Sequence, residues 1–249
     1  MQEELKFDLC CAARSLFRQG LSVSIAGHIS VKVGPEAMLV NRFGPSFGTL
    51  TPDDILLVDF DGKILEGIGW VNDTIRLHGV VHRMNPQHVA VAHTHPPGVV
   101  TWSALRQLPQ VYDQEGCFLA GEVAIVEEDY EGLAATEDRV LPVGEALRTH
   151  AAVILPNHGA ITAGPSIPVA LLRMILLEQT AQRNLAVAAA ARNTGLTPRP
   201  ISPEAALRAK QELANLPAIE PIWADILAQL KRTDPELFAA REQSSACAS

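Results

Sequence analysis

The chain contains 249 residues, of which 47% are hydrophobic and 19% are charged, so it can bury the core of one large globular domain. Its formal net charge of -8 argues against nucleic-acid or anionic-membrane partners, because both attract basic surfaces. No apolar run approaches the roughly 20 residues that cross a bilayer, and the acidic start of the sequence does not resemble a secretory signal. The four cysteines show no disulfide-scaffold or zinc-finger spacing. We therefore expect a cytoplasmic protein that acts on a small molecule.

The first part of the chain predicts a helix followed by short strands that pair as hairpins. An amphipathic helix over residues 3–18 is closed by Gly20, a residue type that commonly ends helices. Strands are expected over the apolar stretches 22–33, 37–41 and 55–59. Asp61-Gly62 signals a hairpin turn, so this part of the sheet should be antiparallel.

Further along the chain, strands alternate with helices. Helical spacing of apolar side chains predicts helices over residues 74–84, 97–105 and 167–193. Short apolar stretches predict strands over residues 89–93, 122–126 and 152–156. Two helices and a polar tail are expected from residue 203. Because the two kinds of element are mixed and no long linker separates them, the sequence predicts one α/β domain with a mixed or largely antiparallel sheet covered by helices.

Two histidines stand at the end of a predicted strand, in the sequence Val89-Ala-Val-Ala-His93-Thr-His95-Pro-Pro97. Side chains two residues apart on a strand point to the same face, so His93 and His95 can present two imidazoles to one point. The prolines that follow cannot continue the hydrogen-bonded ladder and end the strand there. This arrangement indicates a metal ion held at the edge of a sheet.

A catalytic metal usually has three protein ligands, and His158 is a candidate for the third. It also follows a predicted strand, and the next residue, Gly159, allows the backbone to approach closely. Three neutral imidazoles would leave coordination positions open for water or substrate, as in catalytic sites. His78 and His82, four residues apart on a predicted helix, are a rival pair, although the glutamate of a zinc-protease motif is missing between them.

Seven segments carry a resemblance to a known family. In chain order they are Gly27-His-Ile-Ser30, the loop at 41–48, Thr51-Pro-Asp-Asp-Ile-Leu-Leu-Val-Asp-Phe-Asp-Gly62, Leu77-His-Gly-Val-Val-His82, Ala92-His-Thr-His-Pro96, Asp129-Tyr-Glu-Gly132 and Leu155-Pro-Asn-His-Gly159. In this order they resemble the class II aldolase/adducin family over about residues 5–195. The resemblance implies a three-layer α/β/α sandwich and a homotetramer with active sites at subunit interfaces.

The same resemblance implies that His93, His95 and His158 bind one divalent metal ion per subunit. The chain is identified as a member of an adducin-like branch that lacks the aldolase glutamate. We accordingly expect residues 1–202 to form the metal-binding domain. Residues 203–249 would add C-terminal helices and a polar tail packed on the same domain.

The chain departs from the sugar-phosphate aldolases of that family at the catalytic base. Those enzymes carry a glutamate shortly before the helix that precedes the paired histidines, whereas this sequence reads Val71-Asn-Asp-Thr-Ile75. Asp73 is the candidate base, with a carboxylate reach shorter by about 1.5 Å. A helix cap is its alternative role. By resemblance, Tyr130 is the candidate proton donor, with Tyr112 as the alternative.

The phosphate-binding signature of those aldolases is altered as well. His28 stands where they have an asparagine, and their Ser-Ser pair does not occur here. A carboxylate or phenolic substrate held by His28, Arg42 or Arg76 is therefore the alternative to a sugar phosphate, since a guanidinium can bind a carboxylate through two hydrogen bonds. Glu178, in the long helix, is expected to face solvent, with orientation of a ligand histidine as its alternative role.

Three functions follow from these features. The first is a divalent-metal-dependent lyase, of decarboxylase or aldolase type, which acts on a small hydroxy- or oxo-acid while zinc, manganese or iron(II) stabilises an enolate-like intermediate. Loss of carbon dioxide needs no proton abstraction, so the missing glutamate favours a decarboxylase. The second is a non-heme iron(II) oxygenase that acts on a hydroxy- or oxo-acid through the same three histidines. The third is a non-catalytic module similar to the adducin head, and the complete histidine set argues against it.

Overall fold

An eight-stranded sheet forms the centre of the computed structural model, which describes residues 1–22, 25–126, 136–215, 217–239 and 241. The strands are β1 (His28–Lys32), β2 (Ala37–Asn41), β3 (Ile55–Asp59), β4 (Ile64–Glu66), β5 (Ala90–Thr94), β6 (Val123–Ile125), β7 (Ala152–Leu155) and β8 (Gly159–Gly164). They are arranged in the order β4-β3-β2-β1-β5-β8-β7-β6. Neighbours are antiparallel except β6 and β7, which are parallel, and the predicted mixed, largely antiparallel sheet is confirmed.

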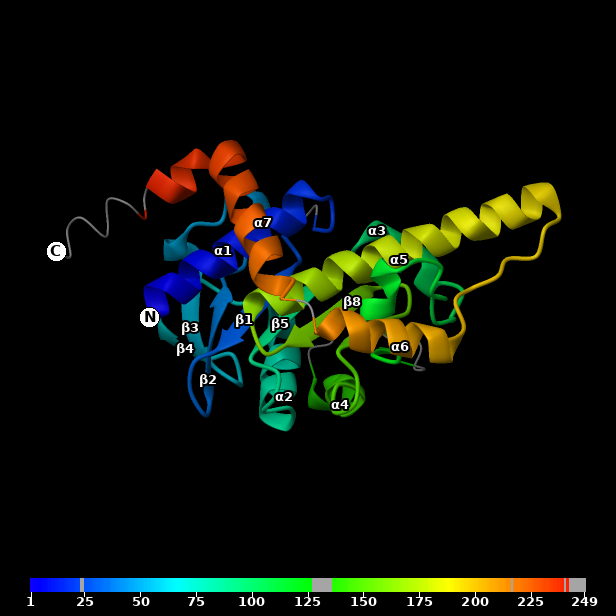
Figure 1. The fold of residues 1–249 in the computed structure, drawn as a ribbon. Helices are drawn as coiled ribbons and strands as arrows, with labels where there is room; N and C mark the ends of the chain where they lie inside the picture. The colour runs from blue at the N-terminus through cyan, green and yellow to red at the C-terminus, as the bar shows by residue number, and fades with distance from the viewer. Residues whose placement is uncertain (23–24, 127–135, 216, 240, 242–249) are drawn as a thin grey trace.

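Helices cover both faces of the sheet and make three layers (Figure 1). The main helices are α1 (Gln2–Arg18) and α5 (Ile167–Thr194) on one face, and α2 (Arg76–Met84) and α4 (Glu137–Ala146) on the other. Side chains of a strand alternate between the two faces. Ala90 and Ala92 of β5 accordingly pack in the α1 and α5 core, while Val91 packs in the α2 and α4 core. The predicted α/β/α sandwich is confirmed.

Short helical segments occupy the connections between these elements. They are α3 (Pro97–Ser103) and the 3-10 segments η1 (Phe47–Thr49), η2 (Pro52–Asp54), η3 (Asp73–Ile75) and η4 (Glu115–Leu119). α3 follows β5 directly and contacts α5, β7 and β8. It therefore lies next to the strand ends that carry the candidate ligands.

The C-terminal helices pack on the main body. They are α6 (Pro203–Ala214) and α7 (Ile219–Thr233). Leu230 of α7 and Leu237 belong to the core cluster beneath α1 and α5. Asp234, fully buried, accepts a hydrogen bond of 2.8 Å from Arg14 of α1. The division of the chain at residue 202 stays a prediction. Within the described residues, no helix is both long enough and apolar enough to cross a membrane.

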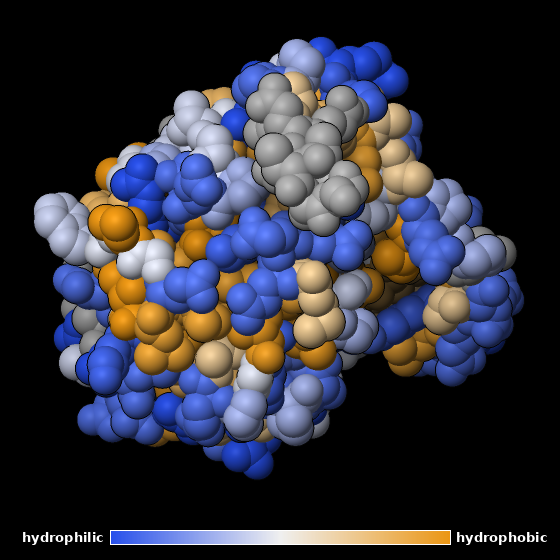
Figure 2. Space-filling model, turned by 90° about the vertical axis from the view of Figure 1, so that its left-hand side faces the viewer, coloured by the Kyte–Doolittle hydropathy of each residue, from blue (hydrophilic) through white to orange (hydrophobic). Residues whose placement is uncertain are grey.

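Exposed apolar side chains follow the edge strand β4. Ile68 and Trp70, in the connection from β4 to η3, are 92% and 77% exposed, and Leu65 of β4 is 51% exposed. Figure 2 views the molecule from the side on which β4 lies in Figure 1, and it shows apolar side chains gathered over part of this face between hydrophilic ones. An apolar surface of this kind is typical of a contact area.

β8 and α4 are among the elements that were not predicted from the sequence. β8 consists mainly of glycine, alanine and threonine, and both glycine and alanine are depleted in strands. All six of its residues are nevertheless buried, because small side chains fit a central strand covered by helices on both faces. α4 contains Pro142, and a proline inside a helix usually predicts a break.

Candidate metal centre

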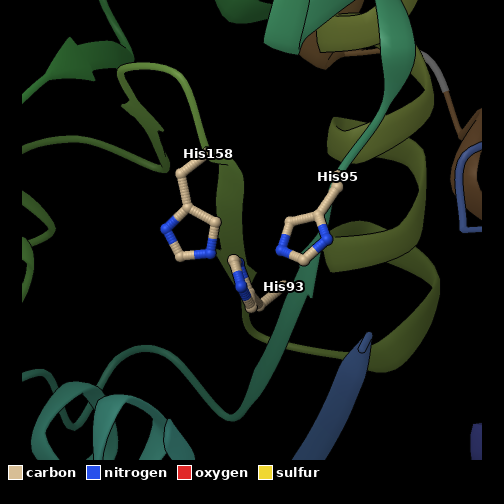
Figure 3. A group of neighbouring side chains, drawn as sticks. All are labelled: His93, His95 and His158. Carbon is tan, nitrogen blue, oxygen red and sulfur yellow. The ribbon is translucent and has the colours of Figure 1, made fainter. Parts of the chain in front are cut away.

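Three histidines converge at one end of the central strands. His93 lies in β5, His95 follows that strand, and His158 lies in the turn between β7 and β8. One ligand atom of each ring lies within 4.8 Å of the others. Figure 3 shows the three rings facing a common space. Their centroids are 4.9–5.0 Å apart. The structure thus brings together the three residues that the sequence predicted as ligands.

Strand pairing explains why residues 65 positions apart meet here. β5 and β8 are antiparallel, with Thr94 opposite Ala160. The turn before β8 is therefore beside the end of β5. Gly159 makes this approach possible, because a Cβ at that position would lie 2.4 Å from the carbonyl oxygen of Thr94 and 2.7 Å from Cδ2 of His95. Asn157, with a φ of 57°, completes the tight turn.

The surroundings of the His93 and His95 rings leave nitrogen lone pairs available for a metal. Nδ1 of His93 lies 3.0 Å from the carbonyl oxygen of Ala160, so it must donate, and Nε2 keeps its lone pair. Nε2 of His95 is buried and has no hydrogen-bond partner among the described residues. A buried nitrogen without a partner is costly unless something binds it. The donor set therefore fits a divalent metal that accepts imidazole, such as zinc, manganese or iron(II).

Burial also keeps these imidazoles neutral, which metal binding requires. Burial, followed by the neighbouring His28, His158 and His95, holds the pKa of His93 well below its usual range. Burial lowers the pKa of His95 as well. Burial and the neighbouring His95 lower the pKa of His158 to about 4. All three rings are thus neutral, and ready to bind a metal, near pH 7.

Within the described residues, the converging group holds three histidines and no carboxylate. Asp73, the predicted base, is the first residue of η3; it is exposed and makes no side-chain hydrogen bond with a described residue. Thr74, the next residue, is buried, and its hydroxyl lies 3.3 Å from Nε2 of His28. Thr74 was not singled out in the sequence, because the side that each residue of a single 3-10 turn faces depends on how that turn docks.

His28 lies beside the three histidines, as its predicted role requires. It is opposite His93 in the β1–β5 pair, and the two ring centroids are 5.4 Å apart. The Thr74 hydroxyl donates to Asn72 Oδ1 at 2.9 Å, so it can accept from Nε2 of His28. Burial and the neighbouring His95 and His158 lower the pKa of His28 to about 3. His28 is therefore a neutral residue in the wall of the site.

The other predicted site residues occupy different surroundings. Nε of Arg42 donates to Oδ1 of Asp54 at 2.7 Å, so the guanidinium is partly committed to an ion pair. Arg76 is exposed at the start of α2, and Tyr112 is half-buried in the connection before η4. Tyr130 lies outside the described residues. The predicted catalytic and substrate-binding roles of these side chains stay predictions.

The rival pair, His78 and His82, forms a separate hydrogen-bonded cluster around Ser30. Nδ1 of His82 lies 3.1 Å from the carbonyl oxygen of His88 and must donate to it. Nε2 of His82 then accepts from the Ser30 hydroxyl at 2.8 Å, and Ser30 accepts from Nδ1 of His78 at 2.7 Å. Burial lowers the pKa of His82 to about 4, which agrees with a neutral ring. Among the described residues, this pair belongs to no convergent group of three ligands.

Glu178 of α5 faces the protein interior, and the prediction that it faces solvent is wrong. Its side chain is buried, and its two oxygens accept hydrogen bonds of 2.8 Å from the backbone amides of Gly98 and Val99. It binds the backbone that follows the paired histidines. Nothing in the local sequence signals this contact, since donor and acceptor are about 80 residues apart.

The fold and the site define an α/β/α sandwich that presents an open three-imidazole group at the ends of its strands. A family model described as Class II Aldolase and Adducin N-terminal domain matches residues 7–185. The chain therefore belongs to the class II aldolase and adducin family, as its sequence motifs predicted.

Similar proteins in this family have different chemistries. The chain is 31% identical over 195 residues to 3,4-dihydroxyphthalate decarboxylase of Arthrobacter keyseri, covering 73% of this chain and 78% of that protein. It is 32% identical over 181 residues to 4-hydroxy-3-prenylphenylpyruvate oxygenase/4-hydroxy-3-prenylbenzoate synthase of Streptomyces roseochromogenus subsp. oscitans, covering 70% of this chain and 64% of that protein. The structure of L-fuculose 1-phosphate aldolase from Glaciozyma antarctica PI12 matches with a TM-score of 0.82 at 26% identity, covering 94% of this chain and 91% of that one.

Proposed function

We propose that the chain is a divalent-metal-dependent carbon–carbon lyase of decarboxylase type that acts on a small hydroxy- or oxo-acid. One observation carries the proposal: within the described residues, three neutral imidazoles converge and no carboxylate joins them. Aldol cleavage requires a base that removes a proton from the substrate. Decarboxylation does not, because the bond to the carboxylate breaks and its electron pair stays on the substrate carbon, which is then protonated.

His93, His95 and His158 are the residues that would hold the metal, one ion per subunit. When bound, a divalent ion supplies a Lewis acid that stabilises negative charge on adjacent substrate oxygens. Neutral ligands suit this role, because they leave the full positive charge of the ion available. Zinc, manganese and iron(II) are all compatible with three imidazoles.

His28 and Thr74 form the wall of the site next to His93 and would contact the substrate there. Both are uncharged, so this wall favours a hydroxyl or carbonyl group over a phosphate. Arg42 is the proposed partner of the substrate carboxylate, with Asp54 orienting its guanidinium. Tyr130 is the proposed proton donor to the carbon that loses carbon dioxide, and Asp73 is the alternative acid or base.

The second candidate function is a non-heme iron(II) oxygenase acting on a similar acid. The oxygenase relative favours it, and so does the absence of a carboxylate from the converging group in the described part of the chain. An aldolase is supported by the fold of the fuculose-phosphate aldolase. A non-catalytic adducin-like module is the third candidate, and the complete ligand set argues against it.

Metal content and gas exchange separate these functions. Protein purified without chelators would be loaded anaerobically with zinc, manganese or iron(II) and mixed with hydroxy- and oxo-acids, beginning with 3,4-dihydroxyphthalate. We expect one carbon dioxide released per acid consumed, with no oxygen uptake, and loss of both metal and activity in His95→Ala. His150→Ala, in the turn that follows α4, is the matched control. Oxygen uptake with iron(II) would establish the oxygenase instead, and metal binding with neither reaction would favour the non-catalytic module.

A cytoplasmic homotetramer remains part of the proposal. The exposed Ile68 and Trp70 beside β4 support a subunit contact, since large apolar surfaces are usually covered. Light scattering on purified protein would measure the mass. A monomer at micromolar concentration would contradict the tetramer.

A further inference from the structure

Glu178 is a buried carboxylate whose two oxygens both bind backbone amides. It is 3% exposed, and it makes no ion pair with a lysine or arginine of the described residues. Its oxygens accept hydrogen bonds from Gly98 and Val99, both at 2.8 Å, and Nε2 of Gln182 donates to one of them at 2.7 Å. Burying a carboxylate is costly, so its place must be compensated by strong hydrogen bonds.

The sequence around α3 explains why a distant residue is needed. The first amides of a helix have no partner inside the helix and are usually capped by a nearby side chain. Here the cap residue is Pro96, which has no side-chain acceptor, and the first helical residue is Pro97. The amides of Gly98 and Val99 are therefore left for Glu178, whose negative charge also matches the positive end of the helix dipole.

α3 touches both segments that carry the candidate ligands. At its start, Pro96 and Pro97 connect it to His95, and each proline holds its backbone φ near -65°. At its end, the hydroxyl of Ser103 accepts a hydrogen bond of 2.9 Å from the amide of Asn157, the residue before His158. The helix thus links the His95 segment to the His158 turn.

α3 packs closely against α5 at the point where Glu178 binds the amides of Gly98 and Val99. A Cβ at Gly98 would lie 2.7 Å from Cγ of Gln182 and 2.9 Å from Oε1 of Glu178. Glycine permits this close approach, and the carboxylate holds it. The long helix α5 is anchored in the main core, so it is a rigid support for the link.

We propose that Glu178 is a positioning residue for the metal centre: its carboxylate fixes α3, and α3 fixes the spacing between His95 and His158. The inference rests on the proposed metal site, but it concerns metal affinity and geometry, and it holds for any of the reactions considered above. Residues that orient ligands from outside typically change metal affinity by about ten- to a hundredfold when they are replaced.

The test is metal affinity in Glu178→Gln, measured by competition with a chromophoric chelator for zinc. A glutamine can accept one of the two amide hydrogen bonds but opposes the other with its own NH2 group. We expect zinc affinity to fall about ten- to a hundredfold. The visible spectrum of the cobalt(II) form, which reports ligand geometry, should also change. Glu212→Gln, an exposed glutamate on α6, is the matched control and should bind zinc as the unaltered protein does.

The outcomes are separable. If the unaltered protein binds no zinc or cobalt, the proposed metal function fails. If it binds metal and folded Glu178→Gln binds equally well with an unchanged cobalt spectrum, the positioning role is refuted, even if the apoprotein melts at a lower temperature. If Glu178→Gln does not fold, Ser103→Ala replaces it in the test. That change removes the hydrogen bond between the end of α3 and the amide of Asn157. Unaltered zinc affinity in Ser103→Ala would then overturn the proposal.

Discussion

Two groups of histidines lie near each other, with His28 between them, and they differ in what their nitrogens meet. His78 and His82 surround the hydroxyl of Ser30, which joins them in one directed hydrogen-bond chain. His93 and His95 instead converge with His158. His78 also has a buried nitrogen, Nε2, without a hydrogen-bond partner in the described structure, so one such nitrogen is not diagnostic. Convergence of three ligand atoms is what distinguishes a candidate metal centre from a hydrogen-bonded core cluster.

The largest expected effect is on metal binding by His95→Ala. Loss of one of three ligands should reduce zinc affinity by more than the roughly hundredfold limit typical of changes outside the ligand set. Bound metal per chain, measured by atomic emission after gel filtration, checks this. His78→Ala is the comparison within the other group, and it should keep its metal. Loss of metal in both variants to the same degree would contradict the distinction between the two histidine groups.

Ser30→Ala is expected to lower stability and leave zinc affinity almost unchanged, the reverse of the result expected for His95→Ala. This change removes a hydroxyl that serves two buried rings, and each unsatisfied group costs about 1–3 kcal/mol. The free energy of unfolding in urea should fall by about 3 kcal/mol, while zinc affinity stays within threefold. A stability unchanged by the substitution would show that the hydrogen-bond chain around Ser30 contributes little.

Added zinc should stabilise the fold only where the three histidines are intact. At a free concentration of 100 times Kd, the gain is about 2.7 kcal/mol. For a chain of this size it raises Tm by about 5–10 °C. Thermal melts with and without zinc measure the gain, and ethylenediaminetetraacetate should reverse it. His95→Ala should show no shift. A shift of equal size in that variant would place the bound metal elsewhere.

The smallest effect is the pH dependence that comes from His82. Its pKa is lowered to about 4 by burial, so the native state excludes a proton that the unfolded chain binds below about pH 6.5. This contribution to stability is fully present above pH 6.5 and is lost as the pH falls toward 4. The loss is about 1.4 kcal/mol per pH unit, or about 2 kcal/mol between pH 6.5 and 5. Urea unfolding of His82→Gln should show a correspondingly shallower decline, and an identical slope in both proteins would contradict this assignment.

Sequence reasoning located the three candidate ligands because each depends on local geometry. His93 and His95 are two residues apart at a strand end, and His158 follows another predicted apolar strand. The sheet was predictable in kind for the same reason, since short apolar stretches and hairpin turns are local signals. β8 was not predicted as a strand, because its small residues are typical of a loop unless the two helical layers that cover it are known.

The roles of Asp73, Thr74 and Glu178 could not be obtained from local patterns. Asp73 and Thr74 differ by one position within a single 3-10 turn, and only the docking of that turn decides which side chain enters the protein. Glu178 lies on a long helix, and a charged helical residue is ordinarily expected to face solvent. Its amide partners reach it only after the chain folds back across about 80 residues.

The hydrogen bond from His93 to the Ala160 carbonyl has a consequence for the way the sheet is assembled. Ala160 pairs with Thr94 in the ladder between β5 and β8 and also holds the ring of His93. A slip of β5 by one residue would turn His93 and His95 to the opposite face. Only the correct register presents the three ligands together. Metal binding would therefore stabilise the sheet in its native register relative to states in which β5 has slipped.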